Sequence, residues 1–251
     1  MNGRFDLAKF VNVAKLRASQ FRILITRRAV ISTQSCPSMI RLSNQLPFAS
    51  GCKRDCYVHP HNPDLVVKII PPDRSIQVLH SKKLWLRRML QTPESMDANR
   101  GEREKFEQLH NRFDNLQEAI PYLVEYHGQV QTDLGEGLVF QAIKNYDGTM
   151  SETIVSAVKT GGYSRTNLLE ALKFLTSIRG DSTIYNDVGK NNLVIQVLDS
   201  KHSKYKLWVI DGINCRALIP ITEHFSMYAR VRKAKKIWKV KRYIQKNFPA
   251  A

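Results

Sequence analysis

The chain has 251 residues, of which 43% are hydrophobic and 24% charged, the composition of a folded globular protein. This length can bury one substantial core or two small lobes. No apolar run approaches the roughly 20 residues that a membrane-spanning helix needs, so the sequence predicts no transmembrane segment.

The formal charge of +17 is concentrated at the two ends of the chain. Residues 1–38 contain seven Lys/Arg and one Asp, and Tyr228–Ala251 contains nine Lys/Arg and no acidic residue. Basic segments attract nucleic acid, acidic lipid or acidic proteins, but charge alone selects none of these partners. Aromatic side chains for base stacking do not alternate with the cations, so a solvated basic helix is favoured over nucleic-acid binding.

The four cysteines form no C-x-x-C pair, and Cys52 and Cys56 have no nearby pair of His or Cys at zinc-finger spacing, so a zinc site is not expected. Isolated thiols of this kind predict a reducing compartment, which we take to be the cytoplasm.

Residues 1–38 form a basic N-terminal extension without the apolar core of a secretory signal, because three arginines surround only Ile23–Ile25. An organellar presequence would look similar. We favour a start of translation at Met39, with the extension either an artefact of the gene model or a disordered tail.

Two β-prone runs follow, Pro47–Tyr57 and Leu65–Ile70, separated by the turn-rich stretch His59–Asp64. Lys68 lies inside the second run between apolar neighbours. A buried position would require a carboxylate or phosphate partner, because an unpaired ammonium is expensive to bury. The alternative is an edge-strand lysine whose ammonium reaches water.

The middle of the chain predicts helices at Ser75–Gln91 and Asn99–Leu116, and then two strands, Tyr122–Val130 and Gly137–Ile143, around a hairpin turn at Asp133–Gly137. Further on, an amphipathic helix is expected at Arg165–Arg179, with a leucine face buried in the core. Near the C-terminus, a basic helix over Arg230–Lys246 is expected to dock Trp238 on the rest of the protein.

Asp187 stands five residues before Asn192, in a turn between the leucine-rich helix and an apolar strand. A second apolar strand ends at Asp211. The arrangement resembles a protein kinase, in which the first Asp orients the hydroxyl nucleophile, the Asn holds a metal and the later Asp holds the metals that bridge the phosphates. A loop Asp or Asn can also simply cap a turn.

Several further stretches, together with this loop, resemble the YrbL family, the kinase-like proteins of the PhoP regulatory network. The resemblance runs from about Met39 to Lys246. It is carried by Met39–Ser43, Gly51–Pro60, Leu65–Ile69, Tyr126–Gly128, Thr132-Asp133, Asp147-Gly148, residues 187–192 and Leu218–Pro220, followed by the basic helix with its Trp.

The resemblance implies an α+β, two-lobed, protein-kinase-like fold. Residues 39–146 would form the N-lobe, an antiparallel sheet plus a helix, and the hinge. Residues 147–251 would form a mainly helical C-lobe that ends in the basic helix.

The resemblance also implies site roles. Lys68 would contact the phosphates of ATP and assist catalysis, and Glu104 would pair with it, although Glu102 and Glu107 are rivals. Gly51 would lie in the phosphate loop, and the hinge backbone would meet the adenine ring. The remaining implied residues are Gln141, Ala142 and Ile143 at the hinge, Asn192 and Asp211 as ligands of Mg²⁺, and Asp187 as the catalytic aspartate.

The sequence departs from the kinase pattern at three points. Gly51 stands alone where three glycines are usual, Tyr185-Asn186 replaces His-Arg, and no Phe-Gly follows Asp211. Three interpretations stay open: a phosphotransferase acting on an unidentified hydroxyl acceptor, a catalytically silent pseudokinase with a regulatory role, and a basic nucleic-acid-associated protein. They are given in order of preference.

Overall fold

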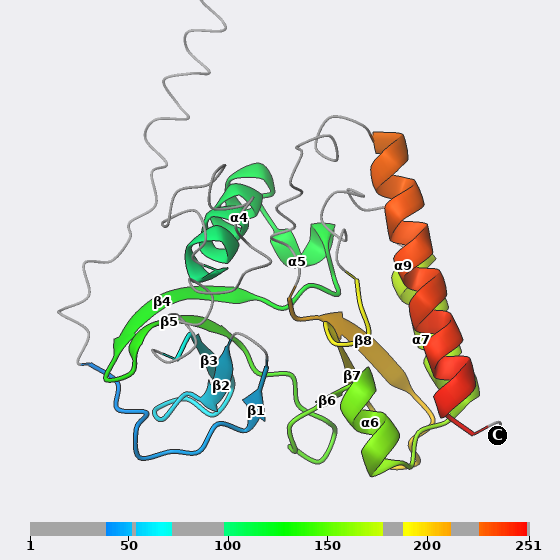
Figure 1. Cartoon of the computed structure of the whole chain (residues 1–251), viewed down its shortest axis with the longest axis horizontal. Coiled ribbons are helices and arrows are strands. Elements are labelled where there is room, and N and C mark those ends of the chain that lie inside the picture. Colours follow the sequence, from blue (N-terminus) through cyan, green and yellow to red (C-terminus); the bar gives the residue numbers. More distant parts are fainter. Residues whose placement is uncertain (1–38, 52–53, 72–97, 178–187, 212–225, 250–251) are drawn as a thin grey trace, which may run out of the picture. The chain divides into compact units, whose positions relative to one another are not determined.

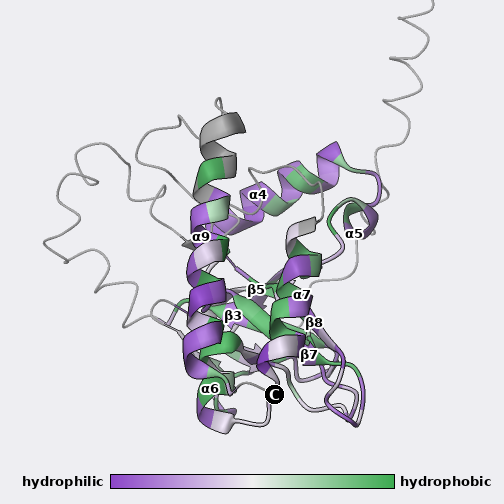
Figure 2. Ribbon diagram, turned by 90° about the vertical axis from the view of Figure 1, so that its right-hand side faces the viewer, coloured by the Kyte–Doolittle hydropathy of each residue, from purple (hydrophilic) through white to green (hydrophobic). Residues whose placement is uncertain are grey.

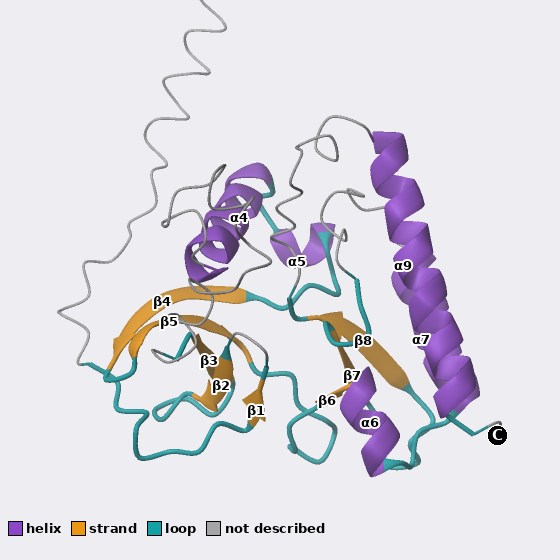
Figure 3. Cartoon of the chain, in the orientation of Figure 1, coloured by secondary structure: helices purple, strands orange, loops and turns teal. Residues whose placement is uncertain are grey.

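The computed structural model describes residues 39–51, 54–71, 98–177, 188–211 and 226–249. They belong to a compact unit, Met39–Ala251, that mixes helices with antiparallel sheets (Figure 1, Figure 3). The extension 1–38, the expected helix Ser75–Gln91 and Asp187 lie outside the described residues.

The first sheet has five strands in the order β1-β2-β3-β5-β4, and every pair of neighbours is antiparallel. Its third strand is central and buried on both faces. Val67 and Ile69 face a small cluster with Ile40, whereas Val66 faces the main core. The strands are β1 (Ala49–Ser50), β2 (Asp55–Val58), β3 (Leu65–Ile69), β4 (Tyr126–Thr132) and β5 (Gly135–Gln141).

The hairpin between β4 and β5 confirms the predicted turn, with Gly135 at φ 111°. Asp133 in this turn accepts hydrogen bonds from the backbone N–H of Leu42 at 2.7 Å and from the hydroxyl of Ser43 at 2.5 Å. These bonds lower the pKa of the Asp133 carboxyl. They attach the segment that follows Met39 to the sheet.

Helix α4 (Ala98–Arg112) contacts β5 and places Phe106 against Phe140, with ring centroids 5.3 Å apart. The expected single helix Asn99–Leu116 is shorter. A second helix, α5 (Leu116–Ala119), begins after Asn115, whose side chain accepts a bond from the backbone of Glu118 at 3.2 Å.

The second sheet has three antiparallel strands in the order β6-β7-β8. Helix α6 follows β6 directly, and Gly161 and Gly162, both at positive φ, end it. Helix α7 packs on β8, and α9 packs on α7. The bounds are β6 (Glu152–Thr153), β7 (Leu193–Val197), β8 (Tyr205–Val209), α6 (Ile154–Thr160), α7 (Arg165–Ser177) and α9 (Ser226–Asn247).

Helix α9 mixes hydrophilic and hydrophobic residues along its length (Figure 2). Among the side chains of α9 that the structure describes, Val240 and Ile244 are buried, and Phe248 just after the helix is buried as well. The expectation that Trp238 docks on the protein is wrong, because 55% of its surface is exposed. Trp238 lies two residues from Val240, about 200° around the helix, so the two cannot share a face.

One hydrophobic cluster joins both sheets, because it contains Phe140 of β5 and Leu207 of β8. The backbone N–H of Val209 donates to the carbonyl of Tyr122 at 2.7 Å, which connects the end of β8 to the segment before β4. The residue that follows β8 is thereby brought to the first sheet. Among the described residues, no helix is long and apolar enough to cross a membrane.

Candidate functional site

Lys68 is the first of the predicted site residues that the structure places in a distinctive environment. It pairs with Cys56 of β2 on one side and Leu138 of β5 on the other, so the edge-strand alternative is wrong. Only 6% of its surface is exposed. Its ammonium donates to the carbonyl oxygen of Ile210 at 2.5 Å and lies 4.0 Å from the ring centroid of Phe140.

The carboxylate that pairs with Lys68 belongs to Glu102 of α4, whose Oε1 lies 3.5 Å from Nζ. The predicted pairing with Glu104 is wrong, since the Glu104 carboxylate instead bonds to Arg100 at 2.9 Å on the exposed side of the helix. The reason is helical periodicity. Glu102 precedes the buried Phe106 by four residues and so shares its face, whereas Glu104 does not.

Arg54 completes the cluster from the turn between β1 and β2. Its Nη1 bonds to Oε2 of Glu102, and its Nη2 lies 3.2 Å from both carboxylate oxygens of Asp211. The Glu102 carboxylate is 1% exposed and therefore contacts two cations away from water. Such a group is stable only when it is paired, so these contacts hold α4 to the sheet.

Asn192 and Asp211, the predicted metal ligands, lie at the same end of the β7–β8 pair. The backbone N–H of Ile210 donates to the carbonyl of Asn192 at 3.0 Å, directly beyond the last register pair, Leu193 and Val209. The structure therefore places the two predicted residues, both with side-chain oxygens, at one end of the strands. Asp187 lies outside the described residues, and its role stays a prediction.

The predicted hinge positions follow the end of β5. The backbone N–H of Gln141 donates to the carbonyl of Glu125 at 2.9 Å, and that of Ala142 to the carbonyl of Asp64 at 2.8 Å. The carbonyl of Ile143 accepts from Ser151 at 2.9 Å. A purine base would thus have to use other backbone groups of this stretch, such as the Gln141 carbonyl or the Ile143 N–H.

Gly51 lies in the turn that the sequence predicted to bind the phosphates of a nucleotide. Its N–H donates to the Arg54 carbonyl at 2.8 Å, and a Cβ at this position would lie 3.4 Å from the same oxygen. The Gly51–Arg54 hydrogen bond closes the turn that places Arg54, and a Cβ at Gly51 would make only an ordinary contact there. The N–H of Gly51 closes this turn, so phosphate contact by Gly51 would require the turn to open.

The electrostatics of the cluster follow from this geometry. Burial lowers the pKa of the Arg54 guanidinium, but the attraction of Glu102 and Asp211 outweighs it, and the net pKa is raised. Burial raises the pKa of the Cys56 thiol, while Lys68 and Arg54 oppose that rise. Arg54 thus stays a cation and Cys56 a neutral thiol at physiological pH. The cluster offers ammonium and guanidinium groups to an anion, and the partly exposed Asp211 to a cation.

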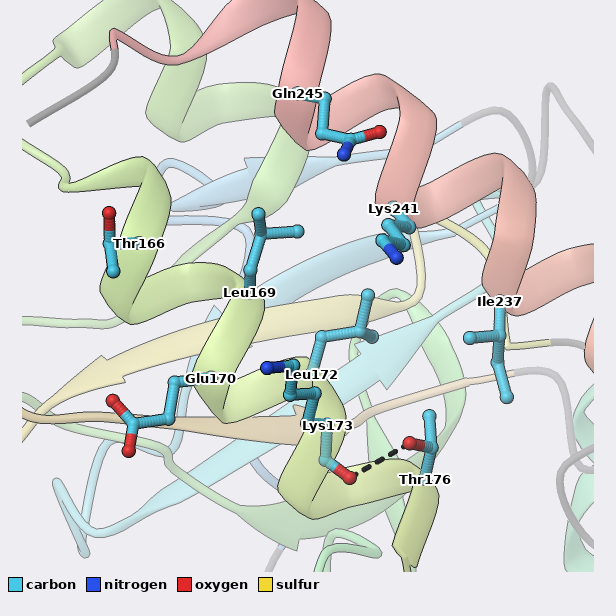
Figure 4. A pocket seen from close by; sticks show the side chains of 9 residues that line it. All are labelled: Thr166, Leu169, Glu170, Leu172, Lys173, Thr176, Ile237, Lys241 and Gln245. Carbon is cyan, nitrogen blue, oxygen red and sulfur yellow. Dashed lines mark hydrogen bonds between the residues drawn. The ribbon is translucent and has the colours of Figure 1, made fainter.

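A separate pocket lies between α7 and α9 (Figure 4). Its lining mixes the apolar Leu169, Leu172 and Ile237 with the charged Glu170 and Lys241. No cluster of metal ligands occurs within the described ranges, and the charged groups of this pocket do not converge on one point in the figure. We therefore place the candidate site at Lys68.

Sequence reasoning missed the part played by Arg54. No local pattern marks an arginine in a turn as a partner of carboxylates that are 48 and 157 residues away. Glu102, by contrast, could have been selected over Glu104 from its spacing to Phe106 and Leu109.

Comparisons with known proteins agree with the extent of the resemblance. The model of the family described as PhoP regulatory network protein YrbL matches residues 40–245. The protein YrbL of Escherichia coli (strain K12) is 27% identical over 209 residues, covering 80% of this chain and 85% of that protein. The YrbL protein of Shigella flexneri matches with the same identity and coverage.

Proposed function

This chain belongs to the YrbL family of PhoP regulatory network proteins, and from that premise we propose that it is a protein-kinase-like protein that binds ATP with Mg²⁺. One observation carries the proposal: Lys68 of β3, Glu102 of α4 and Asp211 after β8 belong to one charge cluster. Protein kinases use a strand lysine paired with a helix glutamate, and a later aspartate that holds metal.

The order of the elements supports a two-lobed arrangement. An antiparallel sheet with α4 and the short α5 would be the N-lobe over 39–146, and α6, α7 and α9 with the small sheet would make up the C-lobe over 147–251. In a kinase the hinge follows the strand next to the lysine strand, and here Gln141 ends β5, which pairs with β3.

Lys68 would bind the phosphates of the nucleotide through its ammonium. The buried carboxylate of Glu102 restricts the position of that ammonium, because its Oε1 lies 3.5 Å from Nζ of Lys68. The bond of Nζ to the Ile210 carbonyl keeps the lysine beside Asp211. The side chain is thus positioned before a ligand arrives, which reduces the entropy lost on binding.

Asn192 and Asp211 would hold Mg²⁺, which when bound neutralises charge on the phosphates. Their chemistry fits the ion, because Mg²⁺ takes oxygen ligands and is commonly held by one or two protein groups plus phosphate oxygens and water. An amide and a carboxylate at the same end of β7–β8 provide such a donor set.

The reaction would be phosphoryl transfer to a hydroxyl. The acceptor oxygen forms a bond to the γ-phosphorus, the bond from that phosphorus to the bridging β–γ oxygen breaks, and the hydroxyl proton passes to Asp187. ADP leaves with the bridging oxygen. The role of Asp187 rests on the sequence, whereas Lys68 and Asp211 have the structural support given above.

A second candidate function is a catalytically silent, nucleotide-binding pseudokinase with a regulatory role. It is favoured by the pairing of Arg54 with both oxygens of Asp211 and by the single glycine of the turn. Both features reduce the access of metal and phosphate to the positions that transfer requires.

Nucleotide binding and turnover of the purified protein test the proposal. Equilibrium binding of ATP with Mg²⁺ and formation of ADP would be measured for the wild type, Asp187→Ala, Asp211→Ala and the control Asp114→Ala, an exposed acid after α4. We expect Asp211→Ala to lose Mg²⁺-dependent binding. We expect Asp187→Ala to keep its ATP affinity while turnover falls by about 100-fold or more.

The outcomes separate the candidates. ATP binding without ADP formation, unchanged in Asp187→Ala, would favour the pseudokinase. A wild-type protein that binds no nucleotide under any condition would overturn both candidates.

A further inference from the structure

Both the backbone and the side chain of Arg54 are fixed by contacts within the protein. Its carbonyl closes the turn with Gly51, and the next residue, Asp55, is buried and accepts a bond from the hydroxyl of Ser50 at 2.5 Å. The Arg54 side chain is itself mostly buried. The guanidinium is therefore a built part of the site, unlike a surface arginine that samples many rotamers.

One of the two carboxylates that Arg54 contacts, that of Asp211, is the group proposed above to hold a metal ion. Its Nη2 lies 3.2 Å from each carboxylate oxygen of Asp211, and its Nη1 is engaged by Glu102. A divalent cation held by Asp211 would have to use the oxygens of the same carboxylate. The guanidinium and the metal ion thus compete for one carboxylate.

The charges of the cluster are already balanced. Arg54 and Lys68 carry two positive charges, and Glu102 and Asp211 carry two negative charges, so the four groups are neutral together. A divalent cation entering alone would therefore have to compete with Arg54 for the carboxylate of Asp211. A polyphosphate would instead bind the two bases in competition with the carboxylates, in a partly buried place where Coulomb interactions are weakly screened.

We infer that Arg54 is an internal counter-ion that stands in for a divalent metal at Asp211, so that the site binds the polyphosphate of a nucleotide without metal. The inference rests on the proposed nucleotide-binding function and specifies its ligand as the free polyphosphate anion. A metal ion that binds later has to displace Arg54 from Asp211.

The first measurement is equilibrium binding of ATP in the presence of a chelator and in the presence of Mg²⁺. We expect the wild type to bind ATP in the chelator with an affinity within about tenfold of that with Mg²⁺. Arg54→Gln should lose about tenfold or more of the metal-free affinity, the effect of removing one charged hydrogen-bonding group. The matched control is Arg100→Gln, on α4, whose side chain is exposed and paired with Glu104.

The second measurement needs no nucleotide. Binding of Mn²⁺ alone, followed by electron paramagnetic resonance, should be about tenfold or more tighter in Arg54→Gln than in the wild type, because the competing cation is gone. A merely structural role of Arg54 would not strengthen metal binding. Arg54→Lys, which keeps the charge without the fork, should stay close to the wild type in this assay, and thermal melting verifies that each variant is folded.

These readouts separate the inference from the function on which it rests. If the wild type binds ATP only with Mg²⁺, the inference is overturned while the proposed function stands. If the wild type binds no nucleotide, the proposed function fails, and the Mn²⁺ titration still decides whether Arg54 blocks Asp211. Equal Mn²⁺ binding by wild type and Arg54→Gln, or none by either, contradicts the inference.

Discussion

Two regions of this protein concentrate charge in opposite ways. The cluster around Lys68 contains two cations and two carboxylates that are mostly buried and contact one another. Helix α9 carries nine Lys/Arg and no acidic residue, and its exposed positions include Lys235, Lys239 and Lys241. The comparison teaches that burial, and not the number of charges, decides where charge controls structure, because water screens the charges of the helix strongly and those of the cluster weakly.

The largest effect is expected from Glu102→Gln, which removes the carboxylate shared by Lys68 and Arg54. Two buried cations would lose their main partner, and we expect the free energy of unfolding to fall by about 3–5 kcal/mol. Chemical denaturation measures it. Glu104→Gln on the same helix, where 45% of the side chain is exposed, should change stability by less than about 1 kcal/mol. Equal losses for the two variants would break the comparison.

A smaller effect is expected inside α9 itself. Ile244→Ala removes a fully buried side chain and should cost about 2–4 kcal/mol. Trp238→Ala removes a larger side chain that is mostly exposed, and should cost less than about 1 kcal/mol. Denaturation of the two variants side by side tests this. A larger loss for Trp238→Ala would mean that the helix docks through the Trp, as the sequence had suggested.

Asp133 is an intermediate case, a partly exposed carboxylate with well-placed donors. Its pKa lies below the usual value of 3.8, because the Leu42 N–H and the Ser43 hydroxyl bond to the charged form. The stabilisation is therefore complete above pH 3.8 and is lost as the pH falls through the lowered pKa.

Melting temperatures of wild type and Asp133→Asn, measured from neutral pH downward, test this case. The wild type should melt higher at neutral pH, and the difference should shrink in acid. The exposed Asp114→Asn serves as the control. A difference that does not depend on pH would show that the charge of Asp133 has no part in holding residues 42 and 43.

The smallest effect is expected from deleting residues 1–38. Ile40 and Leu42 are buried, and Ile40 bonds to Gln131 and Asp133, so the contacts that start the domain lie after the deletion. The melting temperature should change by less than about 2 °C, which corresponds to less than about 1 kcal/mol. A loss of several degrees, or an unfolded product, would assign the extension to the core.

Much of the fold could be predicted because it depends on local patterns. The run around Lys68 alternates between two buried faces, the turn at Asp133 precedes a glycine, and Leu168, Leu172 and Leu175 repeat at helical spacing. The break between α4 and α5 was missed. It depends on Asn115 as a cap, which competes with helix continuation in a way that apolar periodicity does not reveal.

The candidate site was harder to predict, because its contacts span long distances in the sequence. Lys68 and Asp211 could be selected from the sequence, because one lies within a predicted strand and the other directly follows one. The pairing of Arg54 with Glu102 and Asp211 depends on how the turn after β1 lies over α4 and the end of β8, which no local pattern states. The exposure of Trp238 was likewise a matter of helix phase, and Val240 and Ile244 gave the better indication.

The central claim is that the buried cluster binds nucleotide phosphate and that the basic helix does not. Calorimetric titration with ATP of the wild type, Lys68→Met and Lys159→Met tests it most directly, since Lys159 is an exposed lysine at the end of α6 and gives the same charge change. We predict that the wild type and Lys159→Met bind one ATP with similar affinity, and that Lys68→Met binds about tenfold or more weakly. Equal binding by all three proteins, abolished by moderate salt, would place the nucleotide on the basic surface and contradict the account.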